Sequence, residues 1–131
     1  MTSGGDSPMT FTQAIASGFQ NYVNFNDRAA RSAFWYWFLF IVLVSIAAGL
    51  IDAALFPASD VSPVSSLAGL ALFLPGLAVS IRRLHDLDRS GWWYLLIFIP
   101  LIGLIVLLVW YCTRGTVGSN RFGPDPVGGA P

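Results

Sequence analysis

Apolar positions in this chain fall into three long runs, at about residues 34–55, 64–81 and 92–111, with polar residues between and beyond them. Each run is close to the roughly 20 residues that an α-helix needs to cross a hydrocarbon core about 30 Å thick. Aromatic residues begin the first run and stand at both ends of the third, as they do at membrane interfaces. The pattern predicts an all-α integral membrane protein with three transmembrane helices.

A shorter amphipathic segment precedes the first run. Its apolar residues share one face of a helix, and the segment is too short and too polar to span: Phe11, Ile15, Phe19, Tyr22 and Val23. We expect an amphipathic helix lying in the membrane interface. The alternative is a helix packed on the protein's own surface. Asn26 and Asp27 follow and are predicted to cap the first span.

The two ends of the chain, residues 1–8 and 127–131, are rich in Gly, Ser and Pro and are predicted to be disordered. Residues 9–126 are expected to form a single membrane domain. Two proline positions, Pro75 and Pro100, predict bends within the second and third spans. Small residues at Ser45, Gly49 and Ala53 recur every four positions and predict a close helix contact, so a homo-oligomer is plausible.

Composition agrees with a membrane protein. Hydrophobic residues make up 55% and charged residues 11% of the chain, against about 25% charged in soluble proteins. The net charge is zero and lysine is absent, which argues against nucleic-acid binding. The single cysteine, Cys112, excludes an internal disulfide and a cysteine metal cluster. No cofactor is predicted.

The densest polar stretch, residues 82–93, lies between the second and third runs. Arg82 and Arg83 stand four and three residues before Asp86, so either can pair with it on a helix, and Ser90 can cap the next helix. Arginines, a helix amino terminus and indoles at headgroup depth suit an anionic lipid or a partner. The candidate residues are Arg82, Arg83, His85, Asp86, Arg89, Ser90, Trp92 and Trp93. The alternative is a tight charged turn whose arginines serve topology and helix pairing.

An enzymatic role has little support in the sequence. His85 and Asp86 could form an acid–base pair, but neighbours in a helix point to different sides. The sequence contains no second histidine, HExxH spacing, serine elbow or glycine-rich phosphate loop. We therefore expect no enzyme and no metal site.

Orientation follows from the arginines. With three spans, five arginines lie on the amino-terminal side and two, Arg114 and Arg121, on the other, which places the amino terminus in the cytoplasm and the tail outside. If the run around Pro100 were instead re-entrant, the tail would return and all seven arginines would be cytoplasmic. That arrangement satisfies the positive-inside rule better.

Three segments together resemble the domain-of-unknown-function family 805, which consists of small bacterial inner-membrane proteins. They are residues 22–37, residues 82–93 and residues 118–126, and the resemblance covers about residues 9–126. It implies an inner-membrane protein with no established activity or cofactor. The chain departs from the family at Asp27 and Asp88, where glycine is usual, and at Ala33, where an acid is common.

The third of these segments is turn-forming. If the tail is cytoplasmic, Arg121 could meet Asp86 or Asp88 and close a polar cluster over the central stretch, with Arg28, Arg31 and Asn120 as further members. The favoured function is a non-enzymatic scaffold or accessory protein whose arginine-rich cytoplasmic loop engages anionic lipid or a partner protein. A small transporter or channel subunit, and an enzyme acting on a lipid, are the alternatives.

Overall fold

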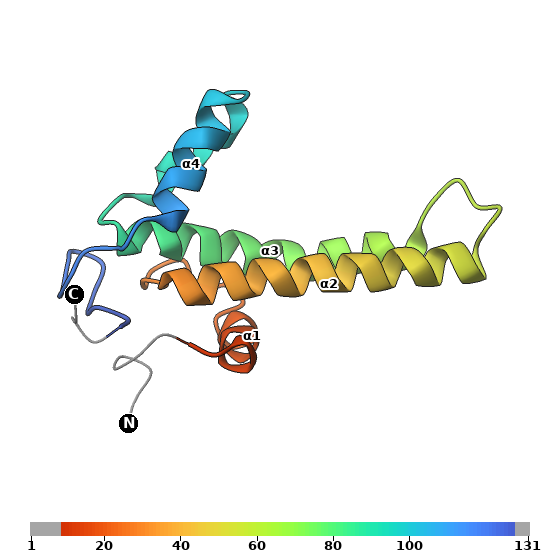
Figure 1. The fold of residues 1–131 in the computed structure, drawn as a ribbon, viewed down its shortest axis with the longest axis horizontal. Coiled ribbons are helices and arrows are strands. Elements are labelled where there is room, and N and C mark those ends of the chain that lie inside the picture. Colours follow the sequence, from red (N-terminus) through yellow and green to blue (C-terminus); the bar gives the residue numbers. More distant parts are fainter. Residues whose placement is uncertain (1–8, 128–131) are drawn as a thin grey trace.

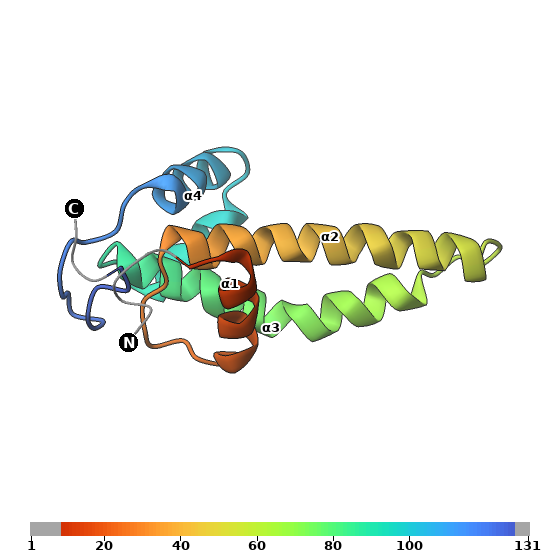
Figure 2. The same cartoon turned by 60° about the horizontal axis from the view of Figure 1, so that its bottom comes forward.

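The computed structural model of the protein describes residues 9–127 and is all-helical. Its frame is a pair of long antiparallel helices that lie side by side, α2 (Arg31–Leu55) and α3 (Pro63–Asp86) (Figures 1 and 2). Within the described residues, these are the two helices long and apolar enough to cross a membrane. They occupy the positions of the first two predicted spans. The predicted disorder of 1–8 falls outside the described residues, as does that of 127–131 except Val127.

Both helices extend further toward one end of the molecule than the apolar runs suggest. The first begins at Arg31 after Ala30, which makes no side-chain cap. The predicted cap at Asn26–Asp27 is therefore wrong, because three residues separate Asp27 from the first residue of the helix. The second continues through the arginines to Asp86, since charged side chains there are satisfied by tertiary contacts.

At the opposite end, Asp52 joins the two helices. Its carboxylate oxygens accept hydrogen bonds from the backbone N–H groups of Val64 and Ser65, each at 2.9 Å. These amides belong to the first turn of α3, which has no partner for them within the helix. Asp52 is buried and caps α3 from a neighbouring helix.

The third apolar run reverses direction near its middle. It forms a 3₁₀ helix η2 (Gly91–Phe98) and an α-helix α4 (Ile102–Cys112). The rings of Trp93 and Trp110 lie 5.7 Å apart, whereas a straight helix would separate these positions by about 25 Å. The prediction of one continuous third span is wrong, and the re-entrant alternative describes the backbone. The hairpin leans away from α2 and α3 (Figure 1).

Pro100 and Gly103 make this reversal possible. Pro100 has no N–H to continue a helix, and Leu101 takes a positive φ of 64°. A Cβ at Gly103 would lie 1.6 Å from the Leu96 carbonyl oxygen, so only glycine fits there. The bend that Pro100 was predicted to cause within a span is therefore the tip of a hairpin.

The amphipathic segment forms α1 (Phe11–Gln20), which lies across α2 and α3 (Figure 2). Gly18 packs so closely on Trp37 that a Cβ would be 2.3 Å from the indole. The Phe19 and Trp37 rings meet edge to face at 5.1 Å. α1 is thus packed on the protein's own surface, which was the second of the two expected arrangements. That the exposed residues of α1 also contact lipid stays a prediction.

Tyr22, just after α1, completes the contact with α3. Its hydroxyl donates to the Ala71 carbonyl oxygen. Ala71 stands four residues before Pro75, and a proline removes the N–H that would bond this carbonyl within the helix. The bend predicted at Pro75 therefore leaves an acceptor that Tyr22 satisfies.

The buried core lies at the end where α2 begins and α3 ends. It contains Phe34, Trp37, Val79, Leu84, Leu107 and Tyr111. The other half of the helix pair is apolar and open: Leu50, Leu67 and Leu70 are 67%, 68% and 75% exposed. Exposed apolar surface on this scale indicates contact with lipid or another chain.

Candidate functional site

All seven arginines gather at the end of the molecule that carries the core. They come from the start of α2, the end of α3, the following turn and the carboxyl-terminal tail, which the hairpin returns to this end. Contacts between these segments, described below, link the arginines into one region. Asp52 and Asp60 lie at the opposite end. The molecule is therefore strongly polarised in charge although its net charge is zero.

Asp86 is the centre of this region. Its Oδ1 lies 2.9 Å from Arg28 Nη2, and its Oδ2 lies 2.8 Å from Arg83 Nη1. The three side chains are 2% exposed or less. One carboxylate thus neutralises part of the charge of two buried guanidiniums. The predicted Arg83–Asp86 pair, at a helical spacing of three, is confirmed.

Arg28 also holds the tail. Its Nη1 donates to the carbonyl oxygens of Gly118 (2.7 Å) and Gly123 (3.1 Å), and its Nη2 to that of Thr116. The Thr116 N–H in turn donates to the Asp86 carbonyl oxygen at 2.7 Å. Arg28 therefore joins the start of α2 to the tail, while Asp86 joins both to the end of α3.

The tail packs directly against Asp86. A Cβ at Gly115 would be 2.0 Å from Asp86 Oδ2. Asn120 donates to the His85 carbonyl oxygen at 2.9 Å. Asp125 is buried and accepts hydrogen bonds from Arg114 and the Gly118 N–H, both at 2.9 Å. The resulting unit, which we call the arginine–aspartate cluster, comprises Arg28, Arg83, Asp86 and tail residues 114–125.

Arg82 was the other predicted partner of Asp86, but its guanidinium points to another side of α3. It donates to the carbonyl oxygens of Asn21 and Asn24, at 3.1 and 2.9 Å, and so fixes the segment between α1 and α2. Arg83 additionally donates to the Thr113, Trp110 and Tyr111 carbonyls at the carboxyl end of α4. A cation at this helix end is favourable, because unpaired carbonyls and the helix dipole are negative there.

His85 takes no part in an acid–base pair with Asp86. Its Nδ1 lies 3.0 Å from the Asp27 carbonyl oxygen, and its ring stacks on Phe122 with centroids 3.9 Å apart. The Asp86 carboxylate is directed to Arg28 and Arg83 instead. Among residues 9–127 there is no group of three side chains that could hold a metal ion.

The remaining predicted site residues form a more open edge. The Arg89 guanidinium lies 4.1 Å above the Trp110 ring, and Arg31 donates to the Cys112 carbonyl oxygen at 3.2 Å. Ser90 accepts from the Trp92 N–H at 3.1 Å and caps η2, as predicted. Trp92 and Trp93 are 79% and 47% exposed. Arg31, Arg89 and Trp93 thus lie at the end of α4. We call these three residues, together with exposed Trp92, the outer edge.

Arg121 meets Asp88, as predicted for a tail that returns to the central stretch. Its Nε lies 3.2 Å from Asp88 Oδ1, and its Nη2 donates to the Asp88 carbonyl oxygen at 2.9 Å. Asp88 has a φ of 59°, which agrees with the expectation that it replaces a turn glycine. The pair is half exposed, in contrast to the buried pairs of Asp86.

The structure gives several of these residues a different role from the one that the sequence predicts. Arg82, Arg83, His85 and Asp86 were candidates for binding a headgroup, but their side chains are buried and bonded within the protein. Headgroup binding stays a prediction for the outer edge. Sequence reasoning missed Arg28 as a partner of Asp86, together with Gly115 and Thr116. The only available signal was the turn-forming segment at 118–126.

Comparison with known proteins gives a consistent result. A family model described as a protein of unknown function (DUF805) matches residues 22–124. Inner membrane protein YhaI of Escherichia coli K12 is 48% identical over 118 residues, which cover 90% of this chain and 98% of that protein. Inner membrane protein YhaH of the same strain is 44% identical over 109 residues, covering 82% and 90%. No solved structure matches.

Proposed function

The chain belongs to this family of unknown function, and from that premise we propose that it is a multi-pass protein of the bacterial inner membrane. In this proposal it crosses the bilayer twice, through α2 and α3, and acts as a non-enzymatic scaffold or accessory protein. Its arginine-bearing end faces the cytoplasm and binds anionic lipid headgroups. The exposed leucines of α2 and α3 support the membrane placement.

The orientation is argued from charge. Arginine in short loops and near the ends of spans favours the cytoplasmic side. With two spans and a hairpin, all seven arginines lie on one side and none on the other. The amino terminus, the central loop and the tail would then all be cytoplasmic, and the loop of residues 56–62 would be outside.

Lipid binding is argued from the two arginines of the outer edge. Neither Arg31 nor Arg89 forms an ion pair with a carboxylate among the described residues. Arg89 Nε is buried and has no hydrogen-bond partner there. Exposed indoles beside them fit the headgroup layer. The single observation that carries the proposal is this separation: Arg28 and Arg83 are buried and share the carboxylate of Asp86, whereas Arg31 and Arg89 have no ion pair among the described residues.

The test measures phosphatidylglycerol bound to the detergent-solubilised protein by native mass spectrometry. Arg31→Gln and Arg89→Gln should each weaken binding about fivefold, since a basic residue near an anionic surface contributes about 1 kcal/mol. Arg121→Gln is the matched control, because it removes one exposed arginine that is already paired with Asp88. Equal binding by all four proteins would contradict the proposal.

A further inference from the structure

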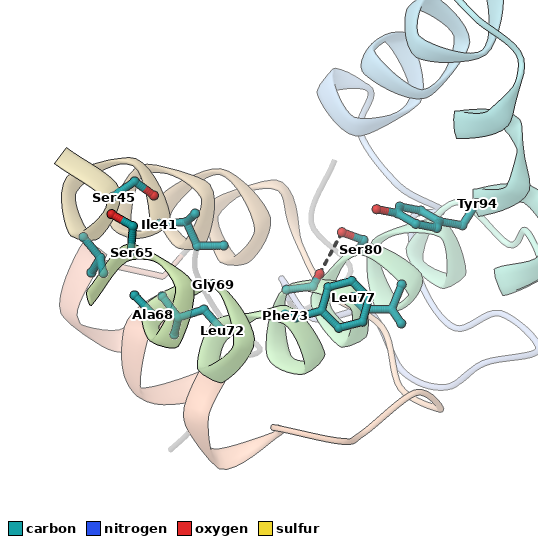
Figure 3. A pocket seen from close by; sticks show the side chains of 12 residues that line it. Ile41, Ser45, Ser65, Ala68, Gly69, Leu72, Phe73, Leu77, Ser80 and Tyr94 are labelled. Carbon is teal, nitrogen blue, oxygen red and sulfur yellow. Dashed lines mark hydrogen bonds between the residues drawn. The ribbon is translucent and has the colours of Figure 1, made fainter. Parts of the chain in front are cut away.

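Small residues of α2 and α3 line a groove between these helices. Ser45, Ser65, Gly69 and Gly76 line a cavity of about 320 Å³ (Figure 3). A second cavity of about 270 Å³ lies between the hairpin and the same helices. Both are lined by Ile41, Gly76, Ser80 and Tyr94 and so adjoin one another. Of the small residues predicted to favour a close helix contact (Ser45, Gly49 and Ala53), Ser45 lines this mainly apolar groove.

One buried polar group lines this groove without a partner. Trp37 and Tyr111, which are 1% and 6% exposed, both line the second cavity. Trp37 Nε1 has no hydrogen-bond partner within residues 9–127, whereas the Tyr111 hydroxyl interacts with the side chain of Ser80. A Cβ at Gly76 would lie 3.7 Å from Trp37 Nε1, so the indole nitrogen faces the groove at that position.

The chemistry of the indole N–H defines the missing partner. An indole N–H can only donate, so its partner must be an acceptor. Leaving it unpaired in an apolar setting costs about 1–3 kcal/mol, which an acceptor would remove. The surrounding side chains are apolar, so the occupant needs an apolar body that carries a carbonyl or similar oxygen near one end.

The position of the groove along the helices indicates that its occupant is a membrane lipid. Trp37 is six residues beyond the start of α2, about 9 Å along the helix. The headgroup layer occupies roughly 5–8 Å on each side of the hydrocarbon core, so Trp37 lies near the level of glycerolipid ester carbonyls. From Ser80 to Ser65 the groove follows α3 for about 22 Å, which exceeds half the thickness of a core about 30 Å thick.

We infer that this groove binds one bilayer glycerolipid, with an acyl chain between α2 and α3 and the ester carbonyl accepting a hydrogen bond from Trp37 Nε1. The inference rests on the membrane placement proposed above but not on the outer edge. The groove holds a chain and its ester, whereas the outer edge would hold a headgroup charge.

The first experiment compares two lipids with the same zwitterionic phosphatidylcholine headgroup and the same chain lengths, one diester and one diether. Native mass spectrometry should show that the wild type binds the diester about three- to tenfold better, the range expected for one hydrogen bond. Trp37→Phe, which removes the indole N–H, should reduce this preference in a variant that thermal unfolding shows to be folded. Equal binding of the two lipids would overturn the ester contact, while leaving the proposed headgroup surface untouched.

The second experiment fills the groove. At both Gly69 and Gly49 a Cβ would have no neighbour within 4 Å, but only Gly69 lines the groove. Gly69→Leu should reduce diester binding at least fivefold, and Gly49→Leu should leave it unchanged. Thermal unfolding of both variants reports whether they are folded. Wild-type binding by folded Gly69→Leu, or an equal loss in both variants, would refute the groove as the binding place.

Discussion

Arg28 and Asp86 are 58 residues apart in the sequence, yet Arg28 Nη2 lies 2.9 Å from Asp86 Oδ1 in a pair that is almost completely buried. Arg28 precedes the first long helix and Asp86 ends the second. The same guanidinium binds three carbonyl groups of the tail. This pair therefore ties three separate segments together at the end of the molecule where the chain would enter the cytoplasm.

Removing the charge of Asp86 should destabilise the protein severely. Asp86→Asn leaves two buried guanidiniums without their carboxylate, and breaking a buried pair in this way costs about 3–5 kcal/mol. Asp88→Asn is the matched control, because its exposed pair with Arg121 contributes about 1 kcal/mol or less. Thermal unfolding in mild detergent measures both. A similar small change for the two variants would show that the cluster does not hold the fold.

Gly115→Ala should release the tail. The added methyl group would overlap Asp86 Oδ2, and backbone on both sides must shift to relieve it. Overpacking of this kind costs about 1–3 kcal/mol. Hydrogen exchange should become faster at the Thr116 amide, which donates to Asp86, and little changed in the middle of α2. Exposed Ser119→Ala is the control. Unaltered exchange at Thr116 in Gly115→Ala would argue against a docked tail.

Tyr22 and Pro75 should be energetically coupled. Tyr22→Phe leaves the Ala71 carbonyl without its donor, which should destabilise the protein by about 1–3 kcal/mol. In a Pro75→Ala background, the new backbone N–H at position 75 can bond the same carbonyl, so Tyr22→Phe should have a smaller effect there. A double-mutant cycle on unfolding free energies measures the coupling. Additive effects would mean that the hydroxyl does not serve the bend.

Acid should weaken the docking of the tail through Asp125. Burial raises the pKa of this carboxyl, but hydrogen bonds from Val127, Arg114 and Gly118 outweigh it and hold the pKa below 3.8. The folded state therefore binds fewer protons than the unfolded state, so this stabilisation is complete above about pH 4 and is lost as the pH falls further. Hydrogen exchange of the Gly118 amide should become faster below pH 4, relative to intrinsic rates, and Asp125→Asn should remove that dependence.

How much the sequence reveals depends on how local each feature is. The helices α2 and α3 follow from apolar runs of spanning length, and the Arg83–Asp86 pair and the Ser90 cap follow from short spacings. Arg121 and Asp88 were expected to meet only if the tail returned. These features depend on helix periodicity, turn chemistry and charge.

Other features depend on distant contacts. The twenty residues around Pro100 are long enough for a span whether they cross the membrane or reverse. The close approach of Gly103 to Leu96, which accompanies the reversal, exists only once the hairpin has formed. Asp52 caps the first amides of α3 across the intervening loop, and no local sequence signal indicates that contact. Nothing local to Arg28 indicates that it binds Asp86, so the cluster could not be assembled from spacing alone.

The central claim is that the chain crosses the membrane twice and that the hairpin returns the tail to the cytoplasmic side. Labelling with a membrane-impermeant maleimide tests it, in variants whose native cysteine is removed by Cys112→Ser. The reporters are Ser119→Cys in the tail and Ser59→Cys in the opposite loop, both at exposed positions. The account predicts that intact spheroplasts label Ser59→Cys and spare Ser119→Cys, which becomes reactive after lysis. Labelling of Ser119→Cys from outside would contradict it.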